Sequence, residues 1–429
     1  MTPFATCHSS EGWNPVLSDV SDRKLKNIIE SCLNGNEYER ALRMNTGHVT
    51  RYYIPTKIVR GNGALEQLGI EAKALKAVRA LIVTGKNLAK TGFVKRIQDI
   101  LKSEGIESEV FDEVMPDPTV KLVEKGTNIL KDGKFDILIG LGGGSNIDAA
   151  KAMSVMANNP GSITDYEGSD KFANQPMPII AIPTTAGTGS EVSYSSVITD
   201  TDRNYKLVVW SSLLTPKVAI LDPALPSTAP VSIRIAAGMD ALTHAIESYV
   251  SKTASPYTEA LALSAIKQIS DHLRMCIADA HNQVAMSHIQ IAANMAGMAF
   301  TNTRLGIVHA LALPPSALFH IPHGMVNAIL LPYGMEFNLI SNPRKFINIA
   351  QTMGEHVDGI RVMEAAMLAV DAVVELADDI GAPATLGGAG VTEDSIEQMA
   401  KDAMKSGHIA VNPREVTYEN ALEIYHKAL

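Results

Sequence analysis

Four residues in the second half of the chain carry side chains of the kinds that bind metal ions. They are Asp240, His244, His309 and His323. Asp240 and His244 are one helical turn apart, so on a helix both side chains project from the same face. One carboxylate and three neutral imidazoles form an oxygen and nitrogen ligand set that suits iron(II), zinc or cobalt. The sequence therefore predicts a divalent-metal site, whose chemistry would be to polarise an oxygen atom of a substrate.

The surroundings of these residues strengthen the metal prediction. Each candidate ligand lies in an otherwise apolar stretch, as His309 does at the start of HALALPPSALF. An unpaired carboxylate is costly to bury in such surroundings, and a bound cation removes this cost. His320 lies three residues before His323, but its spacing fits no ligand role. A lone histidine is more often a core or surface residue, and we interpret six others in that way: His272, His281, His288, His356, His408 and His426.

A glycine-rich turn in the first half of the chain could bind a phosphate. The segment ILIGLGGGSNIDAAK places Gly142, Gly143, Gly144 and Ser145 between an apolar strand and a helix. Glycines let the backbone come close to a phosphate, and the free N–H groups at a helix start attract its charge. Ser145 and Asp148 have the spacing of a capping box, which predicts that the helix begins there. We also expect Asp148 to be one of the cofactor-binding residues. Similar turns occur in α/β proteins that bind no phosphate, so this turn alone leaves both interpretations open.

A second loop favours nucleotide binding. PTTAGTGSE, residues 183–191, follows another apolar strand and carries the hydroxyl groups of Thr184, Thr185, Thr188 and Ser190. These hydroxyls suit a pyrophosphate, a ribose or a nicotinamide amide. Ligands of parallel sheets bind at the carboxyl ends of the strands, where both loops are expected.

The elements around these loops predict the fold class. The expected strands lie within residues 79–84, 107–112, 135–145 and 177–185, and the expected helices within residues 88–105, 118–133 and 146–158. This alternation is typical of a parallel, doubly wound sheet. Beyond Pro223 the pattern is helical almost throughout. We therefore expect an α/β dinucleotide-binding domain over residues 48–223 and an all-α metal-binding domain over residues 224–429.

The composition of the chain excludes several classes of protein. The net charge of -9 leaves no basic surplus to neutralise the phosphates of a nucleic acid. No apolar run approaches the length of a membrane span. The 3 cysteines are widely separated and form no CxxC pair, which excludes a thiolate metal cluster and indicates a reducing compartment. The amino terminus fits neither a secretory nor a mitochondrial signal, so we expect a cytoplasmic protein with no membrane or nucleic-acid partner.

Residues 1–47 differ from the rest and are interpreted as an extension. After a polar, irregular start, DRKLKNIIESCL reads as one short amphipathic helix. The simpler interpretation is a disordered or loosely docked extension, or a start codon assigned upstream of Met44. The alternative is that residues 1–43 dock the enzyme onto a partner or an assembly.

Together, these segments resemble the iron-containing (group III) alcohol dehydrogenases. The resemblance spans roughly residues 52–429 and is carried by the following stretches: YIPTKIVRGNGALEQLG, GGGSNIDAAK, PTTAGTGSE, AILDPAL, GMDALTHAIESYVS, FTNTRLGIVHALA, IPHGMVNAILLPYGMEFN and NPREVTYENALEIYHKAL. It implies a nucleotide-binding domain and a helical metal domain, with the active site in the cleft between them. It also implies that the chain assembles as a homodimer or a higher homo-oligomer.

The resemblance assigns roles to individual residues. The metal ligands of the family correspond to Asp240, His244, His309 and His323, and the cofactor-binding residues to Gly142, Gly143, Gly144, Ser145, Thr184, Thr185 and Thr188. Lys206 corresponds to a residue near the nicotinamide, and Phe300 to one that lines the substrate pocket.

The chain departs from the family at two positions. Many members carry a further histidine four residues after the third ligand, often assigned to proton transfer, where this chain has Leu313. A leucine cannot relay a proton, so the route is absent or passes through water, the cofactor ribose or His320. Members that prefer NAD often have an aspartate at the end of the first strand, where this chain has Gly85 and Lys86. A lysine at this point, with no carboxylate beside it, favours binding of the negatively charged 2′-phosphate of NADP. We therefore expect NADP to be preferred to NAD.

The expected activity is reversible hydride transfer between a primary alcohol and NAD(P), with iron(II), zinc or another divalent metal polarising the alcohol oxygen. One alternative is a hydroxyacid–oxoacid transhydrogenase with tightly held nucleotide. A second is a cyclase-lyase of the dehydroquinate synthase type, which shares the fold. A third is a scaffold role through the extension.

Overall fold

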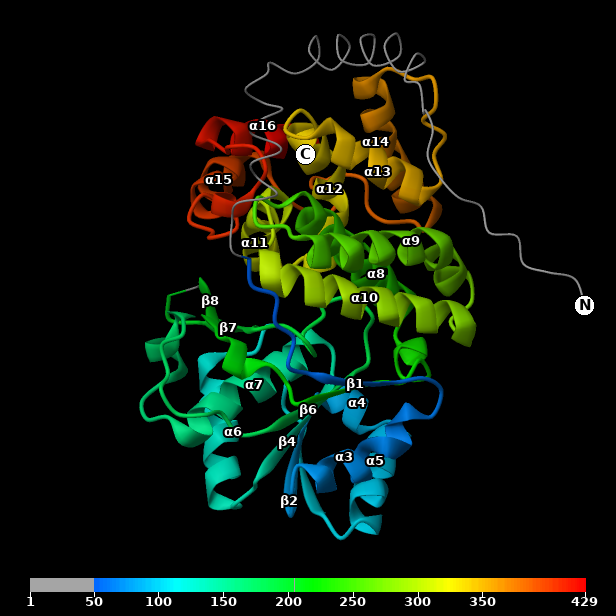
Figure 1. Ribbon diagram of the computed structural model, residues 1–429. Helices are drawn as coiled ribbons and strands as arrows, with labels where there is room; N and C mark the ends of the chain where they lie inside the picture. Colours follow the sequence, from blue (N-terminus) through cyan, green and yellow to red (C-terminus); the bar gives the residue numbers. More distant parts are fainter. Residues whose placement is uncertain (1–49, 204) are drawn as a thin grey trace, which may run out of the picture. The chain divides into compact units, whose positions relative to one another are not determined.

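The computed structural model of the chain describes residues 50–203 and 205–429. The expected extension over residues 1–47 and its docking helix lie outside the described residues. Residues from Tyr52 to Leu429 form one compact unit. Within this unit, a sheet with flanking helices is followed along the chain by a region built from helices (Figure 1).

The main sheet has 6 strands in the order β1-β9-β6-β4-β2-β3. Every pairing within it is parallel, so the carboxyl ends of the strands meet at one edge. The strands are β1 (Lys57–Arg60), β2 (Arg79–Val83), β3 (Glu107–Phe111), β4 (Ile137–Gly142), β6 (Ile179–Pro183) and β9 (Val218–Leu221). Strands β4 and β6, which precede the two loops, are neighbours at the centre of this sheet.

Helices cover both faces of the sheet. Alternate side chains of a strand point to opposite faces, so Ile82 packs with α3 (Leu68–Ala74) and α5 (Gly92–Ser103). Leu81 packs on the other face with α6 (Val120–Asp132) and α7 (Gly144–Asn158). Figure 1 shows α3 and α5 on one side of the sheet and α6 and α7 on the other. The expected fold class, a doubly wound parallel sheet joined to a helical region, is confirmed.

Two local features differ from the expected elements. The single helix expected over residues 88–105 is two helices, α4 (Lys86–Ala89) and α5, because the hydroxyl of Thr91 accepts a hydrogen bond from Phe93 N and starts a new helix. A second sheet was not expected. It consists of β5 (Gly168–Ser169), β7 (Ser195–Asp200) and β8 (Tyr205–Trp210), of which the last two are antiparallel.

The helical region begins at Val231, after the last strand of the sheet. Its helices are α8 (Val231–Val250), α9 (Pro256–Ala278), α10 (Gln283–Thr303), α11 (Ile307–Phe319), α12 (His323–Leu339), α13 (Pro343–Met353), α14 (Val362–Asp379), α15 (Ile396–Ala403) and α16 (Tyr418–Ala428). Helix α8 is central and packs against α9, α10 and α12. Nearly all of its residues are buried, including its polar ones, which therefore need partners inside the protein.

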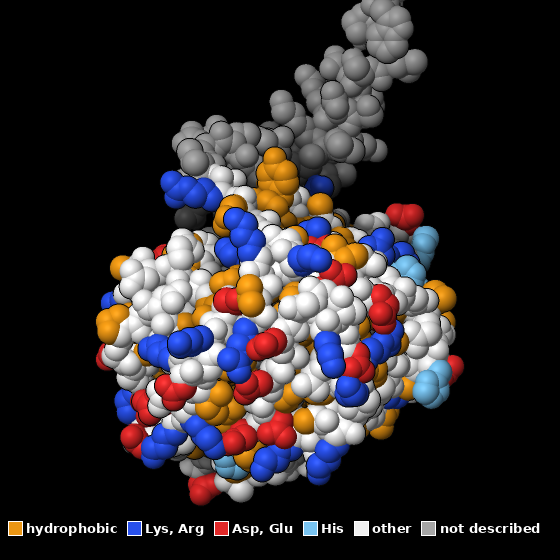
Figure 2. Space-filling view, turned by 90° about the horizontal axis from the view of Figure 1, so that it is seen from below, with side chains coloured by type: hydrophobic (Ala, Val, Ile, Leu, Met, Phe, Trp, Pro, Cys, Tyr) orange, Lys and Arg blue, Asp and Glu red, His pale blue; other side chains and the backbone are white. Residues whose placement is uncertain are grey.

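The exterior has a mixed charge pattern. On the face of the molecule shown in Figure 2, acidic and basic side chains are interspersed. Exposed charges of the described residues also form ion pairs, as Lys95 does with Asp99 and Lys125 with Glu113. Among the described residues, no helix is both long enough and apolar enough to cross a membrane.

Candidate active site

The structure brings three of the four predicted metal ligands into one cluster. Asp240 and His244 lie on α8, and His309 lies in the first turn of α11. One ligand atom from each lies within 4.8 Å of the others, and all three residues are buried. His323, the first residue of α12, lies beside this cluster, with its ring centroid 5.3 Å from that of His309. The sequence had pointed to all four residues, and folding makes three of them converge.

The distances in this cluster leave room for a cation. Asp240 Oδ1 lies 3.8 Å from His244 Nε2 and 3.7 Å from His309 Nε2. These separations are too long for hydrogen bonds, but two ligands that each lie about 2.0–2.2 Å from one metal ion are separated by such distances. The side-chain amide nitrogen of Asn327 approaches from α12, 2.8 Å from Asp240 Oδ1 and 3.2 Å from His309 Nε2.

The charges of the cluster also favour a cation. Burial opposes ionisation of Asp240, but interactions with the imidazoles of His244, His309 and His323 lower the pKa of its carboxyl group. Burial likewise opposes ionisation of Glu247, but its hydrogen bond with His309 lowers the pKa of that carboxyl group. Two buried carboxylates therefore carry negative charge in a site where the ring of His244 stays neutral, since burial lowers its pKa to about 4.

The third histidine responds to these carboxylates. Burial opposes protonation of His309, yet the carboxylates of Asp240 and Glu247 raise its pKa to about 9. A positive charge is thus favoured at the ring of His309, and a metal ion bound there would replace the proton. The buried Oδ1 of Asn327 accepts no hydrogen bond from the described residues, although buried polar atoms usually have a partner. This atom too would be satisfied by a cation or by a further donor in the site. The residues present therefore fit a divalent cation.

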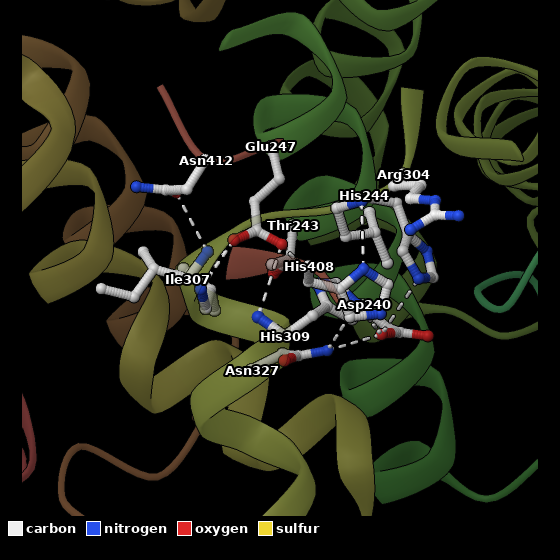
Figure 3. A network of polar contacts seen from close by, with 12 residues as sticks. Asp240, Thr243, His244, Glu247, Arg304, Ile307, His309, Asn327, His408 and Asn412 are labelled. Carbon is white, nitrogen blue, oxygen red and sulfur yellow. Dashed lines mark hydrogen bonds and ion pairs between the residues drawn. The ribbon is translucent and has the colours of Figure 1, made fainter. Parts of the chain in front are cut away.

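Sequence reasoning missed Glu247. Its carboxylate lies 2.6 Å from His309 Nδ1 and 2.7 Å from Val308 N (Figure 3). The spacing in the sequence could have indicated Glu247, because it lies three residues after His244 and seven after Asp240, on the same face of a helix.

The interpretation of His408 as an ordinary core or surface residue was incomplete. Its ring lies edge-on to that of His309, with centroids 6.3 Å apart, and its Nδ1 accepts a hydrogen bond from Leu305 N at 3.3 Å. Burial and the charge of His309 lower its pKa to about 4. No local spacing could have shown this, because the carboxy-terminal segment folds back onto α11 from 103 residues away.

The remaining catalytic candidates lie around the cluster. The ring of Phe300, on α10, stacks on that of His244 with centroids 4.4 Å apart. Lys206, on β8, forms an ion pair of 2.7 Å with Asp117. Burial lowers the pKa of His323 to about 3, and the charge of Lys206 acts in the same direction.

Two residues considered for the proton route lie further along α11. Leu313 is half-buried and lies one turn after His309. His320 is exposed and lies just after the last residue of α11, in the left-handed backbone region at φ 55°.

The two predicted nucleotide loops lie against each other at the carboxyl ends of β4 and β6. Thr184 N donates a hydrogen bond of 3.0 Å to the carbonyl of Gly142. A Cβ atom on Gly143 would lie 3.4 Å from the Thr185 side chain, and one on Gly144 would lie 2.9 Å from that of Thr188. At position 144 only glycine allows so close an approach, and the hydroxyls of Thr185 and Thr188 therefore lie beside the amino terminus of α7.

The predicted capping box is wrong. Helix α7 begins at Gly144 with Gly143 as its N-cap residue, and no side chain caps it. The helix starts earlier than expected because Gly142 turns the chain sharply at φ 143°. The carboxylate of Asp148 accepts hydrogen bonds from Ser190 Oγ and Val197 N, each at 3.0 Å. Asp148 thus ties α7 to the second loop, and we assign it this positioning role in place of direct cofactor contact.

The other predicted cofactor residues lie at the end of β2. Gly85 is the N-cap residue of α4, and a Cβ atom there would lie 2.7 Å from the carbonyl oxygen of Val114. Lys86 is the first residue of α4 and is exposed. The structure therefore leaves its ammonium group accessible to a ligand at this edge.

The second loop also joins the nucleotide region to the metal cluster. A Cβ atom on Gly187 would lie 2.6 Å from Ala237 of α8, and one on Gly189 would lie 2.7 Å from Gly297 of α10 and 3.3 Å from the Phe300 ring. The loop therefore packs directly on the two helices that carry Asp240, His244 and Phe300. A ligand held by the loop would lie next to the cluster.

Comparisons with known proteins identify the family. The model of the iron-containing alcohol dehydrogenases matches residues 55–223, and the carboxy-terminal model of the Fe-containing alcohol dehydrogenase family matches residues 234–429. The chain belongs to the iron-containing alcohol dehydrogenase family. It is accordingly an enzyme, an oxidoreductase of the alcohol dehydrogenase type, as the resemblance in its motifs had indicated.

Relatives in this family match the chain over most of its length. It is 40% identical to 1,3-propanediol dehydrogenase from Citrobacter freundii over 379 residues, which are 88% of this chain and 98% of that protein. It is 37% identical to NAD-dependent methanol dehydrogenase from Bacillus methanolicus, covering 89% and 100% of the two chains. It is 38% identical to lactaldehyde reductase from Escherichia coli, covering 86% and 96%.

Solved structures show the same fold. The crystal structure of a 1,3-propanediol oxidoreductase superposes with a TM-score of 0.88 at 38% identity, covering 89% of this chain and 100% of that chain. Sulfoacetaldehyde reductase from Bifidobacterium kashiwanohense, in complex with NAD+, superposes with a TM-score of 0.81 at 30% identity, covering 89% and 99%.

Proposed function

We propose that the enzyme interconverts a small primary alcohol and its aldehyde with NAD(P), using a divalent metal, iron(II) in the cell, held by Asp240, His244, His309 and His323. The observation that carries this proposal is the buried cluster of a carboxylate and imidazoles next to a hydroxyl-lined loop. When bound, the metal supplies a Lewis acid that polarises the oxygen of the substrate.

The two loops are the proposed cofactor site. We propose that the backbone of Gly142, Gly143, Gly144 and Ser145 holds the pyrophosphate at the amino terminus of α7, where N–H groups and the helix dipole favour an anion. Thr184, Thr185 and Thr188 supply hydroxyl donors from the facing loop. The close packing of this loop on α8 and α10 supports its placing the nicotinamide beside the metal.

Lys86 is the proposed determinant of NADP use. The residues at the end of β2 offer no carboxylate to bond a ribose, and the exposed ammonium group of Lys86 would attract a 2′-phosphate. We therefore propose that NADP is preferred to NAD.

Side chains around the cluster have proposed roles in holding the substrate. Phe300 stacks on His244, and Leu313 lies one turn after His309 on α11; their apolar side chains are proposed to exclude water and to favour an uncharged carbon chain. Lys206 is held in place by Asp117 and is proposed to lie near the nicotinamide. The names of the relatives, which include dehydrogenases of methanol and 1,3-propanediol, support a short alcohol as the substrate.

The proposal is tested with protein purified under anaerobic conditions. Metal content is measured first, and oxidation of NADH and NADPH is then followed against a series of short aldehydes. We expect one metal ion per chain and faster oxidation of NADPH. In the variant His244→Ala metal and turnover should be lost while nucleotide still binds, whereas His281→Ala, which removes an exposed histidine, should match the unchanged enzyme.

Two outcomes would contradict the proposal. Full turnover by metal-free protein would eliminate the metal mechanism. Exchange of hydride between two substrates without added NAD(P), with nucleotide retained through purification, would identify a transhydrogenase instead.

A further inference from the structure

Glu247 is a buried carboxylate whose partners surround a predicted metal ligand. It lies on α8, one turn after His244, and only 3% of its surface is exposed. Its closest contact is with His309 Nδ1, at 2.6 Å, and it also accepts a hydrogen bond of 2.7 Å from Val308 N. A carboxylate that is removed so completely from water needs such donors, and His309 is the strongest of them.

This contact fixes which nitrogen of His309 carries its proton. An ionised carboxylate only accepts hydrogen bonds, so Nδ1 of His309 must carry a hydrogen. The neutral ring then has its lone pair on Nε2, which is the atom that faces Asp240 Oδ1 at 3.7 Å. The amide of Asn327 agrees with this assignment, because its nitrogen donates toward Nε2 from 3.2 Å. Glu247 thus turns the lone pair of His309 toward the centre of the cluster (Figure 3).

We propose that Glu247 is a positioning residue for the metal, an inference that rests on the metal site proposed above. It holds the ring of His309 in one tautomer and one orientation, and its charge increases the basicity of Nε2. Carboxylates that bond the outer nitrogen of a metal-bound histidine act in this way in other proteins, and their loss weakens metal binding by about 10–100-fold.

A purely structural role must be separated from this one. Glu247 also caps the start of α11 through Val308 N, so its removal would loosen that helix in any case. Asn412 provides the matched control. Its Oδ1 accepts a hydrogen bond of 3.1 Å from Ile307 N at the same helix end. The hydrogen bonds of its side chain otherwise go to Asn338 and Arg414, and none goes to His309.

The test is a cobalt(II) titration of metal-free, full-length protein under anaerobic conditions, in competition with a chelator. Absorption of the bound cobalt reports both its affinity and its ligand geometry. We expect Glu247→Ala to weaken binding about 100-fold and to shift the cobalt spectrum. In Glu247→Gln the side chain keeps an acceptor for Nδ1 but loses the charge, so binding should weaken about 10-fold. Asn412→Ala should lower the unfolding temperature but leave cobalt affinity within about threefold of the unchanged protein.

The outcomes separate this inference from the proposed function. If the unchanged protein binds no cobalt, the metal site itself is wrong. If the unchanged protein binds cobalt and the Glu247 variants bind it equally well, only the role of Glu247 is wrong. The same conclusion follows if Asn412→Ala weakens binding as much as Glu247→Gln does, because capping of α11 would then explain both. If Glu247→Ala does not fold, the cobalt affinities of Glu247→Gln and Asn412→Ala are compared instead. The role of Glu247 is then supported only if Glu247→Gln binds cobalt more weakly than Asn412→Ala does.

Discussion

Replacing Gly142 with alanine should destabilise the fold far more than replacing its neighbour Gly143. Gly142 has φ 143°, a conformation that side-chain-bearing residues avoid, and a Cβ atom there would lie 2.5 Å from Asn146 Cγ. The backbone conformation costs about 1–3 kcal/mol for a residue other than glycine. Crowding of a packed site adds about 1–3 kcal/mol. We therefore expect Gly142→Ala to lower the free energy of unfolding by about 2–6 kcal/mol.

Gly143 provides the contrast within the same turn. Its backbone is extended, at φ -75° and ψ -172°, and a Cβ atom would meet nothing closer than the Thr185 side chain at 3.4 Å. Gly143→Ala should therefore change the free energy of unfolding by less than about 1 kcal/mol. The added methyl group would still occupy the space through which a phosphate approaches the backbone, so nucleotide binding should weaken.

Two measurements check this pair of variants. Urea unfolding gives the stability of each, and the fluorescence of NADPH gives its affinity. We expect Gly143→Ala to be stable but to bind NADPH more weakly, and Gly142→Ala to be destabilised. Equal unfolding midpoints for the two variants would refute the account of the turn, and unchanged NADPH affinity in Gly143→Ala would refute its role as a phosphate site.

Three further predictions concern single side chains. Burial raises the pKa of the Cys276 thiol to about 12. In a variant whose other cysteines are replaced by serine, the native protein should therefore not react with a thiol reagent at pH 8. The same variant should react fully once it is unfolded in urea. Burial lowers the pKa of Lys151 from its ordinary value of 10.5 to about 8 in the folded protein. Between these two pH values Lys151 is therefore protonated in the unfolded chain but largely neutral in the folded protein. Relative to Lys151→Met, stability in urea should thus rise by about 1–2 kcal/mol from pH 7.5 to 9.5, and a constant difference would contradict this. Phe300→Ala removes the ring that stacks on His244. In a series of aldehydes of increasing chain length, kcat/KM for the short ones should therefore fall about 10-fold relative to the longer ones. An equal fall for all chain lengths would exclude Phe300 from the pocket.

The parallel sheet could be predicted because its strands are buried on both faces. Apolar runs such as RALIV and ILIGLG end at glycines or polar loops, which gives each strand a clear boundary. The antiparallel pair β7 and β8 gave no comparable signal. Buried and partly buried residues alternate along it, and it follows shortly after the loop in which Ser190 forms a hydrogen bond with Asp148.

The start of α7 shows where local patterns mislead. Ser145 and Asp148 have the spacing of a capping box, but the backbone of Gly142 begins the turn before Ser145 is reached. The carboxylate of Asp148 instead accepts hydrogen bonds from Ser190 and Val197, 42 and 49 residues along the chain. Capping rules describe neighbours in sequence, and tertiary partners of a buried carboxylate can replace them.

The metal cluster was predictable to the extent that its residues share one helix. Asp240 and His244 show their common face in their spacing, and Glu247 continues that face by one further turn. His309 was found through its motif, since nothing in the spacing between α8 and α11 brings it near. His408 approaches His309 from a different segment again, and only the folded chain shows that contact.

We propose that the buried cluster of Asp240, His244 and His309 holds the divalent metal on which turnover depends. The most direct test removes the metal with a chelator and then adds iron(II) back under anaerobic conditions, while NADPH oxidation by a short aldehyde is followed. We expect turnover to be lost on removal of the metal and to return at one iron per chain, with no return in His309→Ala. Undiminished turnover in protein shown to contain no metal would contradict this proposal.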